Sequence, residues 1–242
     1  PWRYRAAQGR LAISGISIET GHGPALRTEL EYFGAYFDPM TRSFRGFETR
    51  LKRDLGTARG VVQDAQPTLI TRTVYDVGHG DESLAGKVLS ESRHDETGLH
   101  FDEVVNIYVV QPVDAAGVRF AYMSDSERRI YEGSDVPVVT RTSYVQDIFC
   151  NVIEEAHEGI VTGRVAVTGD ERRIVRTFAN NTDLWIVRVP VAETTYGADG
   201  ATLAASERYY DGAPFDGLPL GELIRGEVSR ERAWVSEATW AD

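Results

Sequence analysis

The sequence predicts an all-β protein, built mainly of antiparallel strands, on three observations. Short runs rich in Val, Ile, Thr, Tyr and Phe recur along the whole chain, and these residues favour pleated, half-buried strands. Apolar and other residues alternate within several runs, so that Val118, Phe120 and Tyr122 fall on one face of a strand. Turn-forming residues separate the runs at the spacing of about 8–12 residues that is typical of antiparallel β proteins, which predicts roughly a dozen or more strands.

Clusters of Gly, Asp and Asn between strand-like runs predict where the chain turns. Hairpin turns are expected at 168–170, 179–181 and 197–200. Irregular structure is expected at 78–86 and 93–103, which are dense in Asp, Glu, His and Gly.

Two segments need a choice between elements. Phe47, Leu51 and Leu55 lie four residues apart with charged residues between them, so a two-turn helix and a strand with charged flanks both fit. The alternation over 184–189 predicts a strand that includes Trp185.

Composition excludes several classes of protein. The 242 residues include 26 Lys and Arg against 37 Asp and Glu, a formal net charge of −11 that opposes binding to nucleic acid or to an anionic membrane surface. The longest uncharged apolar stretch, around 104–110, is far shorter than the roughly 18 residues of a membrane span. Cys150 is the one cysteine, so no internal disulfide forms.

The chain begins at Pro1 with strand-like alternation already under way and with no signal segment. We therefore expect a piece of a longer protein. Residues 1–242 are predicted to form a single β segment of that protein.

A loose repeat joins an aromatic residue, an Asp and a turn residue. It occurs at 74–78, 144–152 and 209–212. The Tyr suits a strand, the Asp can accept hydrogen bonds from backbone amides of the turn, and Gly or Asn takes the positive-φ position. Each unit is a small hairpin that cannot bury its own face, so it must stack on neighbours.

The second unit carries a resemblance to a known family. Tyr144, Asp147 and Asn151 stand as in the Tyr-x-Tyr-Asp-x-x-Gly-Asn-Val pattern of YD-repeat (Rhs) proteins, which this segment resembles. Gln146 replaces the second Tyr and Cys150 replaces the Gly. A residue other than Gly at positive φ costs about 1 kcal/mol, so a distorted turn is expected here.

Two longer strings narrow the resemblance. Residues 36–48 resemble the Tyr-Phe-Asp-Pro … Arg-x-Phe-Arg-Gly-Phe segment of Tc insecticidal toxin B components and their virulence-plasmid relatives, and 209–221 resemble the same family's Tyr-Tyr-Asp-Gly … Phe-x-Gly-Leu-Pro-x-Gly string. Trp185 lies in the stretch expected between them. The matching residues are Asp38, Pro39, Arg42, Phe44, Arg45, Gly46, Phe47, Tyr210, Asp211, Gly212, Gly217, Leu218, Pro219 and Gly221.

These residue types suit folding devices rather than catalysis. Pro39 fixes a turn after Asp38, and Arg42 and Arg45 can bond carbonyl groups or Asp38. The 217–221 string predicts a tight corner with Leu218 as its apolar plug.

The resemblance implies a YD-repeat β-sheet that spirals into part of a hollow shell. Such a shell segment encapsulates a toxic C-terminal polypeptide and helps deliver it into host cells. The implied partners are the rest of the shell (B and C components), the enclosed toxin polypeptide and a pore-forming A component. The resemblance also implies a secreted bacterial protein that does not itself insert into a membrane.

Three groups of residues carry side chains that are suited to chemistry. His94 and His100, with four carboxylates in the same ten residues, could bind a divalent cation. The two histidines are six residues apart, however, whereas those of a zinc-binding helix are four apart. An exposed acidic loop is the simpler interpretation. Glu155 and His157 would share a strand face, either as an acid–base pair or as part of a solvated edge. Cys150 lies among acidic residues, which disfavours a thiolate.

We therefore expect no enzymatic activity, no cofactor and no metal. The alternative is a cell-surface adhesion or carbohydrate-binding module of YD-repeat type, in which Trp2, Trp234 and Trp240 would stack on sugar rings.

Overall fold

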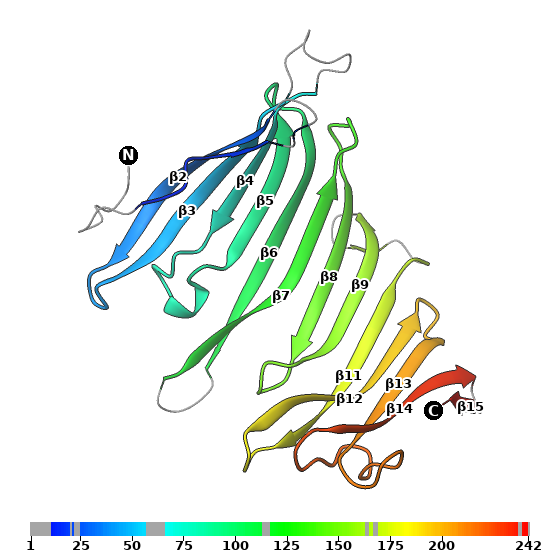
Figure 1. Cartoon of the computed structure of the whole chain (residues 1–242). Coiled ribbons are helices and arrows are strands. Elements are labelled where there is room, and N and C mark those ends of the chain that lie inside the picture. The colour runs from blue at the N-terminus through cyan, green and yellow to red at the C-terminus, as the bar shows by residue number, and fades with distance from the viewer. Residues whose placement is uncertain are drawn as a thin grey trace. The chain divides into compact units, whose positions relative to one another are not determined.

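The computed structural model describes residues 11–19, 21, 25–56, 66–112, 117–162, 165–166, 169–236 and 239–241. Its contacts divide the chain into two compact units, Pro1–Val139 (unit 1) and Thr140–Asp242 (unit 2). Both units are antiparallel β-sheets, coloured blue to green and green to red in Figure 1. The predicted fold class is confirmed, and the described residues contain no α-helix.

Unit 1 is a meander in which each strand pairs with the next one along the chain. Short hairpin connections at 39–42 and 96–99 join neighbouring antiparallel strands, and the connections at 55–68 and 76–87 are longer. A short 3₁₀ turn interrupts the connection between the fourth and fifth strands. The elements are β1 (Gly15–Ile18), β2 (Leu26–Asp38), β3 (Ser43–Asp54), β4 (Leu69–Tyr75), η1 (Glu82–Leu84), β5 (Val88–Asp95), β6 (His100–Pro112) and β7 (Arg119–Ile130).

Unit 2 continues the same design. Its strands pair in the order β8-β9-β11-β12-β13-β14-β15, and β10 pairs with β9. The elements are β8 (Val138–Gln146), β9 (Val152–Thr162), β10 (Val165–Ala166), β11 (Arg172–Asn181), β12 (Ile186–Gly197), β13 (Thr202–Tyr210), β14 (Val228–Ser236) and β15 (Thr239–Ala241).

The segment with four-residue apolar spacing is a strand, since Phe47 and Leu51 lie in β3. Leu51 pairs with Glu31 of β2 on one side and with Arg72 of β4 on the other. A central strand satisfies its backbone groups on both edges, and this pairing outweighs a spacing that was compatible with a helix.

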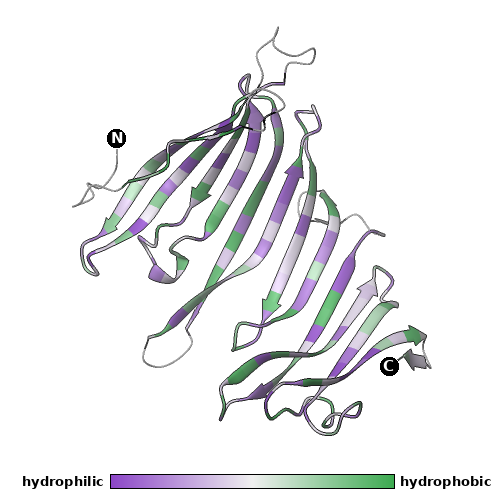
Figure 2. Ribbon diagram, viewed as in Figure 1, coloured by the Kyte–Doolittle hydropathy of each residue, from purple (hydrophilic) through white to green (hydrophobic). Residues whose placement is uncertain are grey.

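The cores of both sheets are small. In unit 2, Val191, Tyr210 and Leu223 are buried together with Ala179. The hydroxyl group of Tyr210 donates to the carbonyl oxygen of Pro190 at 2.5 Å, so the one polar atom of this aromatic side chain is satisfied. Hydrophobic and hydrophilic residues are interspersed along the strands (Figure 2).

Some of the predicted turns and irregular segments are confirmed, and others are wrong. The hairpin turn at 197–200 is present, with the amide of Gly197 donating to the carbonyl oxygen of Ala201 at 2.9 Å, and 78–86 is irregular apart from η1. The turn predicted at 168–170 begins at a position outside the described residues.

Two other predictions fail because strands extend further than expected. Only 96–99 separates β5 from β6, so most of 93–103 is strand rather than loop. The turn predicted at 179–181 lies instead at 182–185, because β11 runs on to Asn181. Trp185 therefore sits in that turn at φ 55° and not in a strand.

Candidate functional site

The motif residues gather at strand ends, where an Asp side chain holds each turn. Asp38 ends β2, and its Oδ1 accepts from the amide of Met40 at 2.9 Å while its Oδ2 accepts from the Thr41 hydroxyl at 2.8 Å. These bonds, that from Thr41 first, lower the pKa of Asp38 to about 2. Pro39 occupies the turn itself, and Arg42 takes the positive φ of 53°.

Arg45 links this turn to the loop at 78–86. Its guanidinium group bonds Asp38 at 3.0 Å, as expected, and also pairs with Glu82 at 2.6 Å. The side chain of Arg42 makes no hydrogen bond to any described residue, so the role expected for it is not seen. Asp81 of the same loop pairs with Arg119 of β7 at 2.8 Å.

Aromatic rings follow the same string. The rings of Phe44 and Phe47 meet edge to face at 5.3 Å between centroids, and Phe47 also lies 4.9 Å from the ring of Tyr32. Gly46 between them has φ 113°, a value that L side chains rarely adopt. The string thus combines a charged link with an aromatic cluster.

The turn after β8 is built around Asp147. Its Oδ1 accepts from the amides of Phe149 and Asn151, both at 2.9 Å. Cys150 adopts φ 65°, the position that the motif gives to Gly. Burial raises the pKa of the Cys150 thiol, and the Asp147 carboxylate raises it further. Tyr144, three residues earlier, lies in β8 with its phenol partly buried, which raises its pKa.

Asp211, directly after β13, holds a longer loop. Its Oδ2 accepts from the amides of Ile224, Arg225 and Gly226 at 2.7, 2.9 and 3.1 Å, and its Oδ1 accepts from Glu227 at 3.2 Å. These backbone bonds, that from Ile224 first, lower the pKa of Asp211 to about 2. One carboxylate therefore fixes a segment that ends sixteen residues further on.

Two glycines of this loop stand where side chains do not fit. A Cβ on Gly217 would lie 2.7 Å from the Cβ of Tyr209, and one on Gly212 would lie 2.9 Å from the backbone of Gly217. Gly221, after Pro219, has φ 92° but open space around it. Leu218 is only half-buried, and the apolar residue that reaches the core is Leu223.

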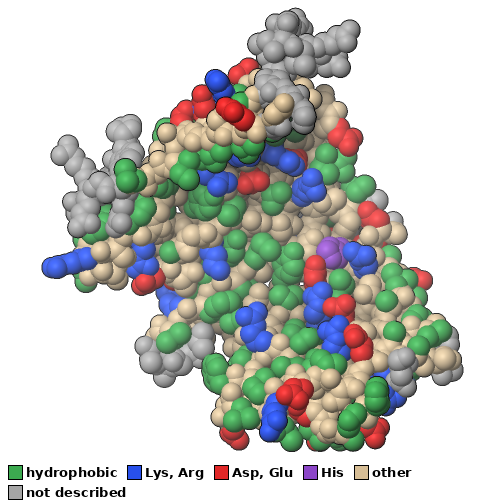
Figure 3. Space-filling model, viewed as in Figure 1, with side chains coloured by type: hydrophobic (Ala, Val, Ile, Leu, Met, Phe, Trp, Pro, Cys, Tyr) green, Lys and Arg blue, Asp and Glu red, His purple; other side chains and the backbone are tan. Residues whose placement is uncertain are grey.

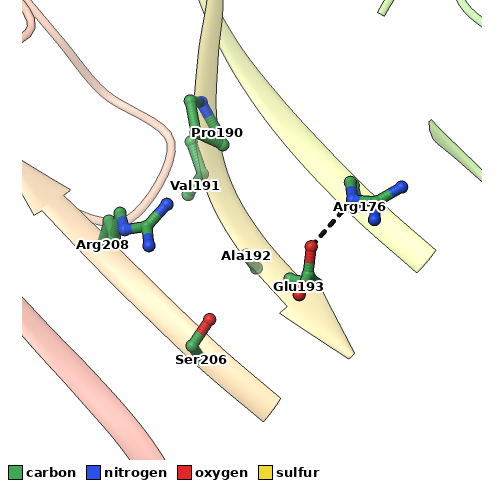
Figure 4. A pocket seen from close by; sticks show the side chains of 7 residues that line it. All are labelled: Arg176, Pro190, Val191, Ala192, Glu193, Ser206 and Arg208. Carbon is green, nitrogen blue, oxygen red and sulfur yellow. Dashed lines mark hydrogen bonds and ion pairs between the residues drawn. The ribbon is translucent and has the colours of Figure 1, made fainter. Parts of the chain in front are cut away.

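Charged side chains form a second feature, which we call the unit 2 charge band: Glu155, His157, Arg176, Glu193, Arg208 and Glu231. Arg176 bonds Glu155 of β9 at 3.0 Å and Glu193 of β12 at 2.7 Å. Arg208 of β13 pairs with Glu231 of β14 at 3.0 Å. Arg176, Glu193 and Arg208 surround a cavity of about 60 Å³ (Figure 4), far below the roughly 300 Å³ of a small ligand pocket.

The acidic run of β9 is divided between the two faces of the sheet. Glu155 and His157 share a face, as predicted, with 3.0 Å between Oε1 and Nε2. Glu154 instead pairs with Arg173 at 2.7 Å, which lowers the pKa of that carboxyl group. Because Arg176 already holds Glu155, a paired structural role fits these carboxylates. Oppositely charged side chains lie next to each other on the face seen in Figure 3.

Unit 1 has a comparable band. Asp102 of β6 is buried between Arg93 and Arg128, and the hydrogen bonds of Arg93 are the main cause of its lowered pKa. His94 and His100 face each other with 5.7 Å between ring centroids. Across the described residues, no three His, Cys, Asp or Glu side chains are placed to hold a metal ion.

Comparisons with known proteins rest on the fold. No family model and no curated protein matches the sequence. Solved structures do match. The chain is similar to the crystal structure of TcdB2-TccC3, with a TM-score of 0.65 and 14% identity over 86% of this chain. The fold of this chain is a fold of Tc toxin chains.

Two further structures agree. The complex TcdB2-TccC3-Cdc42 gives a TM-score of 0.65 at 13% identity, and the Photorhabdus luminescens Tc holotoxin pore gives 0.62 at 15% identity. Each match covers 86% of this chain and 15% of the other, so the chain spans about one seventh of these structures' length. No helix among the described residues is long and apolar enough to cross a membrane.

Proposed function

We propose that this chain is a wall segment of a Tc-toxin-type shell, built from YD-repeat-like hairpins, that encloses a toxic polypeptide and helps deliver it into host cells. The observation that carries the proposal is the fold match to TcdB2-TccC3 over 86% of the chain. Its partners would be the remaining shell (B and C components), the enclosed polypeptide and a pore-forming A component. The protein would be secreted and would have no enzymatic activity.

The construction of the sheets supports this role. A wall that borders water needs polar side chains on both faces, and isolated buried charges would be costly there. Glu154 and Glu155 project to opposite faces and each is held by an arginine, Arg173 or Arg176. Paired charges of this kind leave a sheet face hydrated without a strong local field.

The turns support it as well. A wall of stacked hairpins needs its loops fixed, because each hairpin has little core of its own. The carboxylates of Asp38, Asp147 and Asp211 supply that fixation through backbone amides.

The alternative, a carbohydrate-binding module, receives less support. Trp234 and Trp240 face each other in register, both half-buried, and the guanidinium group of Arg232 lies 5.3 Å from the ring centroid of Trp240. That cation occupies a ring face that a sugar would need. Trp2 lies outside the described residues.

Protease protection tests the proposal. The complete gene product that contains this chain is digested under native conditions, and the survival of its enclosed polypeptide is followed by mass spectrometry. A shell predicts that the polypeptide persists until denaturant opens the wall. Asp211→Asn should lower the denaturant concentration at which protection is lost, whereas Asp216→Asn, an exposed change in the same loop, should not. Digestion at the rate of the free polypeptide would contradict the proposal.

A further inference from the structure

A pocket of about 270 Å³ opens beside β2, β3 and β4 of unit 1. Tyr32, Phe47 and Tyr75 supply aromatic lining, and the side chains of Arg45 and Arg50 supply the N–H groups. Ligand pockets usually measure about 300–1,000 Å³, so this one suits a group the size of one amino acid side chain. Neither the turn motif nor the proposed function assigns it a role.

The two arginines differ in charge balance. Arg45 has two carboxylate partners, Asp38 at 3.0 Å and Glu82 at 2.6 Å. Its positive charge is therefore neutralised within the protein. Arg45 offers the pocket a hydrogen-bonding edge but no net charge.

Arg50 has no carboxylate partner among the described residues. Its Nη2 donates to the hydroxyl oxygen of Thr73 at 3.2 Å, and its guanidinium group lies 6.0 Å from the ring centroid of Tyr75. Its Nε is buried and has no hydrogen-bond partner in the part of the chain that the structure describes.

Partial burial is what distinguishes Arg50. Arg27, Arg42 and Arg72 also lack a described carboxylate partner, but they are exposed to solvent, whereas Arg50 is half-buried. Water compensates an exposed cation, but a half-buried cation gains much more from a counter-ion. A negatively charged ligand would supply it.

Neighbouring groups restrict which anion fits. Thr73 is only 1% exposed, and its hydroxyl donates to Glu91 at 3.1 Å, so Glu91 orients Thr73 instead of pairing with Arg50. Asp76 also lines the pocket, although its Oδ1 already accepts from the amide of Gly78 at 2.7 Å. The pocket thus offers one uncompensated cation, Arg50, next to one carboxylate, Asp76. This charge balance favours a singly charged anion over a phosphate dianion.

The geometry points to a binding site for a single carboxylate carried on an aromatic or aliphatic body. The guanidinium group of Arg50 would form charge-assisted hydrogen bonds with the carboxylate, and the rings of Tyr32, Phe47 and Tyr75 would flank the body. A free aromatic acid and an acidic side chain of a polypeptide share this chemistry. The inference is independent of the proposed shell role.

Isothermal titration calorimetry of the complete gene product that contains this chain tests the site. The probes are phenylacetate, its neutral analogue phenylacetamide, inorganic phosphate, and blocked Phe-Glu-Phe and Phe-Gln-Phe tripeptides. We expect phenylacetate to bind at least about tenfold more tightly than phenylacetamide, which corresponds to one charge-assisted contact. Tighter binding of the Glu tripeptide than of phenylacetate identifies a polypeptide as the source, and the reverse order identifies a small acid.

Variants identify the residue responsible. Arg50→Gln should weaken phenylacetate binding about tenfold or more, whereas Arg72→Gln, an exposed change on the neighbouring strand, should leave it unchanged. Arg50→Lys, which keeps the charge, provides a second variant and should retain part of the affinity. Equal binding of phenylacetate and phenylacetamide, tighter binding of phosphate, or undiminished binding by Arg50→Gln would each overturn the assignment.

Discussion

The side-chain amide of Asn151 donates to the backbone carbonyl oxygen of Val187 at 2.8 Å, across 36 residues of sequence. The same Nδ2 donates to Oδ2 of Asp147 at 2.9 Å, and Asn151 is only 2% exposed. One buried amide thus joins the Asp147 turn to the beginning of β12. Adjacent hairpins are tied together by side chains at their ends as well as by their backbone ladders.

Replacing Asn151 with Ala should therefore destabilise the chain by about 1–3 kcal/mol, because a buried side chain and both of its hydrogen bonds are lost. Urea unfolding followed by circular dichroism measures the change. Thr182→Ala, in the exposed turn that precedes β12, is the matched control and should cost less than about 0.5 kcal/mol. Equal effects of the two substitutions on the free energy of unfolding would show that the hydrogen bond to Val187 does not stabilise the chain.

Replacing Cys150 with Gly should stabilise the chain by up to about 1 kcal/mol. Cys150 has φ 65°, where a Cβ is strained, and the relief exceeds the extra freedom that Gly gives the unfolded chain. Cys150→Ser keeps the Cβ and should bring no gain. The free energies of unfolding of the three proteins decide this, and a loss of stability in the Gly variant would refute the strain argument.

The glycines of the 211–227 loop provide a graded test. Gly217→Ala places a Cβ 2.7 Å from that of Tyr209, whereas Gly221→Ala meets nothing within 4 Å. Both positions have positive φ, at 74° and 92°, so both variants carry about 1 kcal/mol of backbone strain. Only Gly217→Ala adds a steric clash, and its melting temperature should fall further. Similar melting temperatures would contradict the close packing described at Tyr209.

Acid should weaken unit 2 through Asp211. Its pKa is about 2 in the folded chain, below the ordinary value of 3.8, so the stabilisation is complete above about pH 4 and is lost as the pH falls towards 2. Asp211→Asn should lower the urea midpoint at neutral pH and reduce the loss of stability between about pH 4 and pH 2. Asp216→Asn should retain the pH dependence of the parent chain. A parent chain equally stable at both ends of that range would contradict the depressed pKa.

The sequence was sufficient to predict the all-β fold class and several turn aspartates, because both depend on local patterns. Alternation identified the strand at Phe120 and Tyr122, whose rings lie on one face with 6.4 Å between centroids. Asn180 and Asn181 suggested a turn at 179–181, but its exact position depends on how far β11 and β12 remain paired. Trp185 was misplaced for that reason.

The charge bands and the Arg50 pocket could not be predicted in the same way. Arg176 meets Glu155 and Glu193 only through the registers of three strands, and residue spacing does not contain those registers. Leu223 lies in a loop without periodicity, so its place in the core of unit 2 had no local signal. Contacts between residues far apart in the sequence decide both the ion-pair partners and the burial of Leu223.

The central claim, that this chain is a wall segment of a shell, is tested most directly by an electron cryomicroscopy reconstruction of the complete gene product. The account predicts a hollow particle in which the strands of residues 1–242 border an enclosed space that contains additional polypeptide density. A solid particle, or one in which these strands enclose no space and border no cargo, would contradict it.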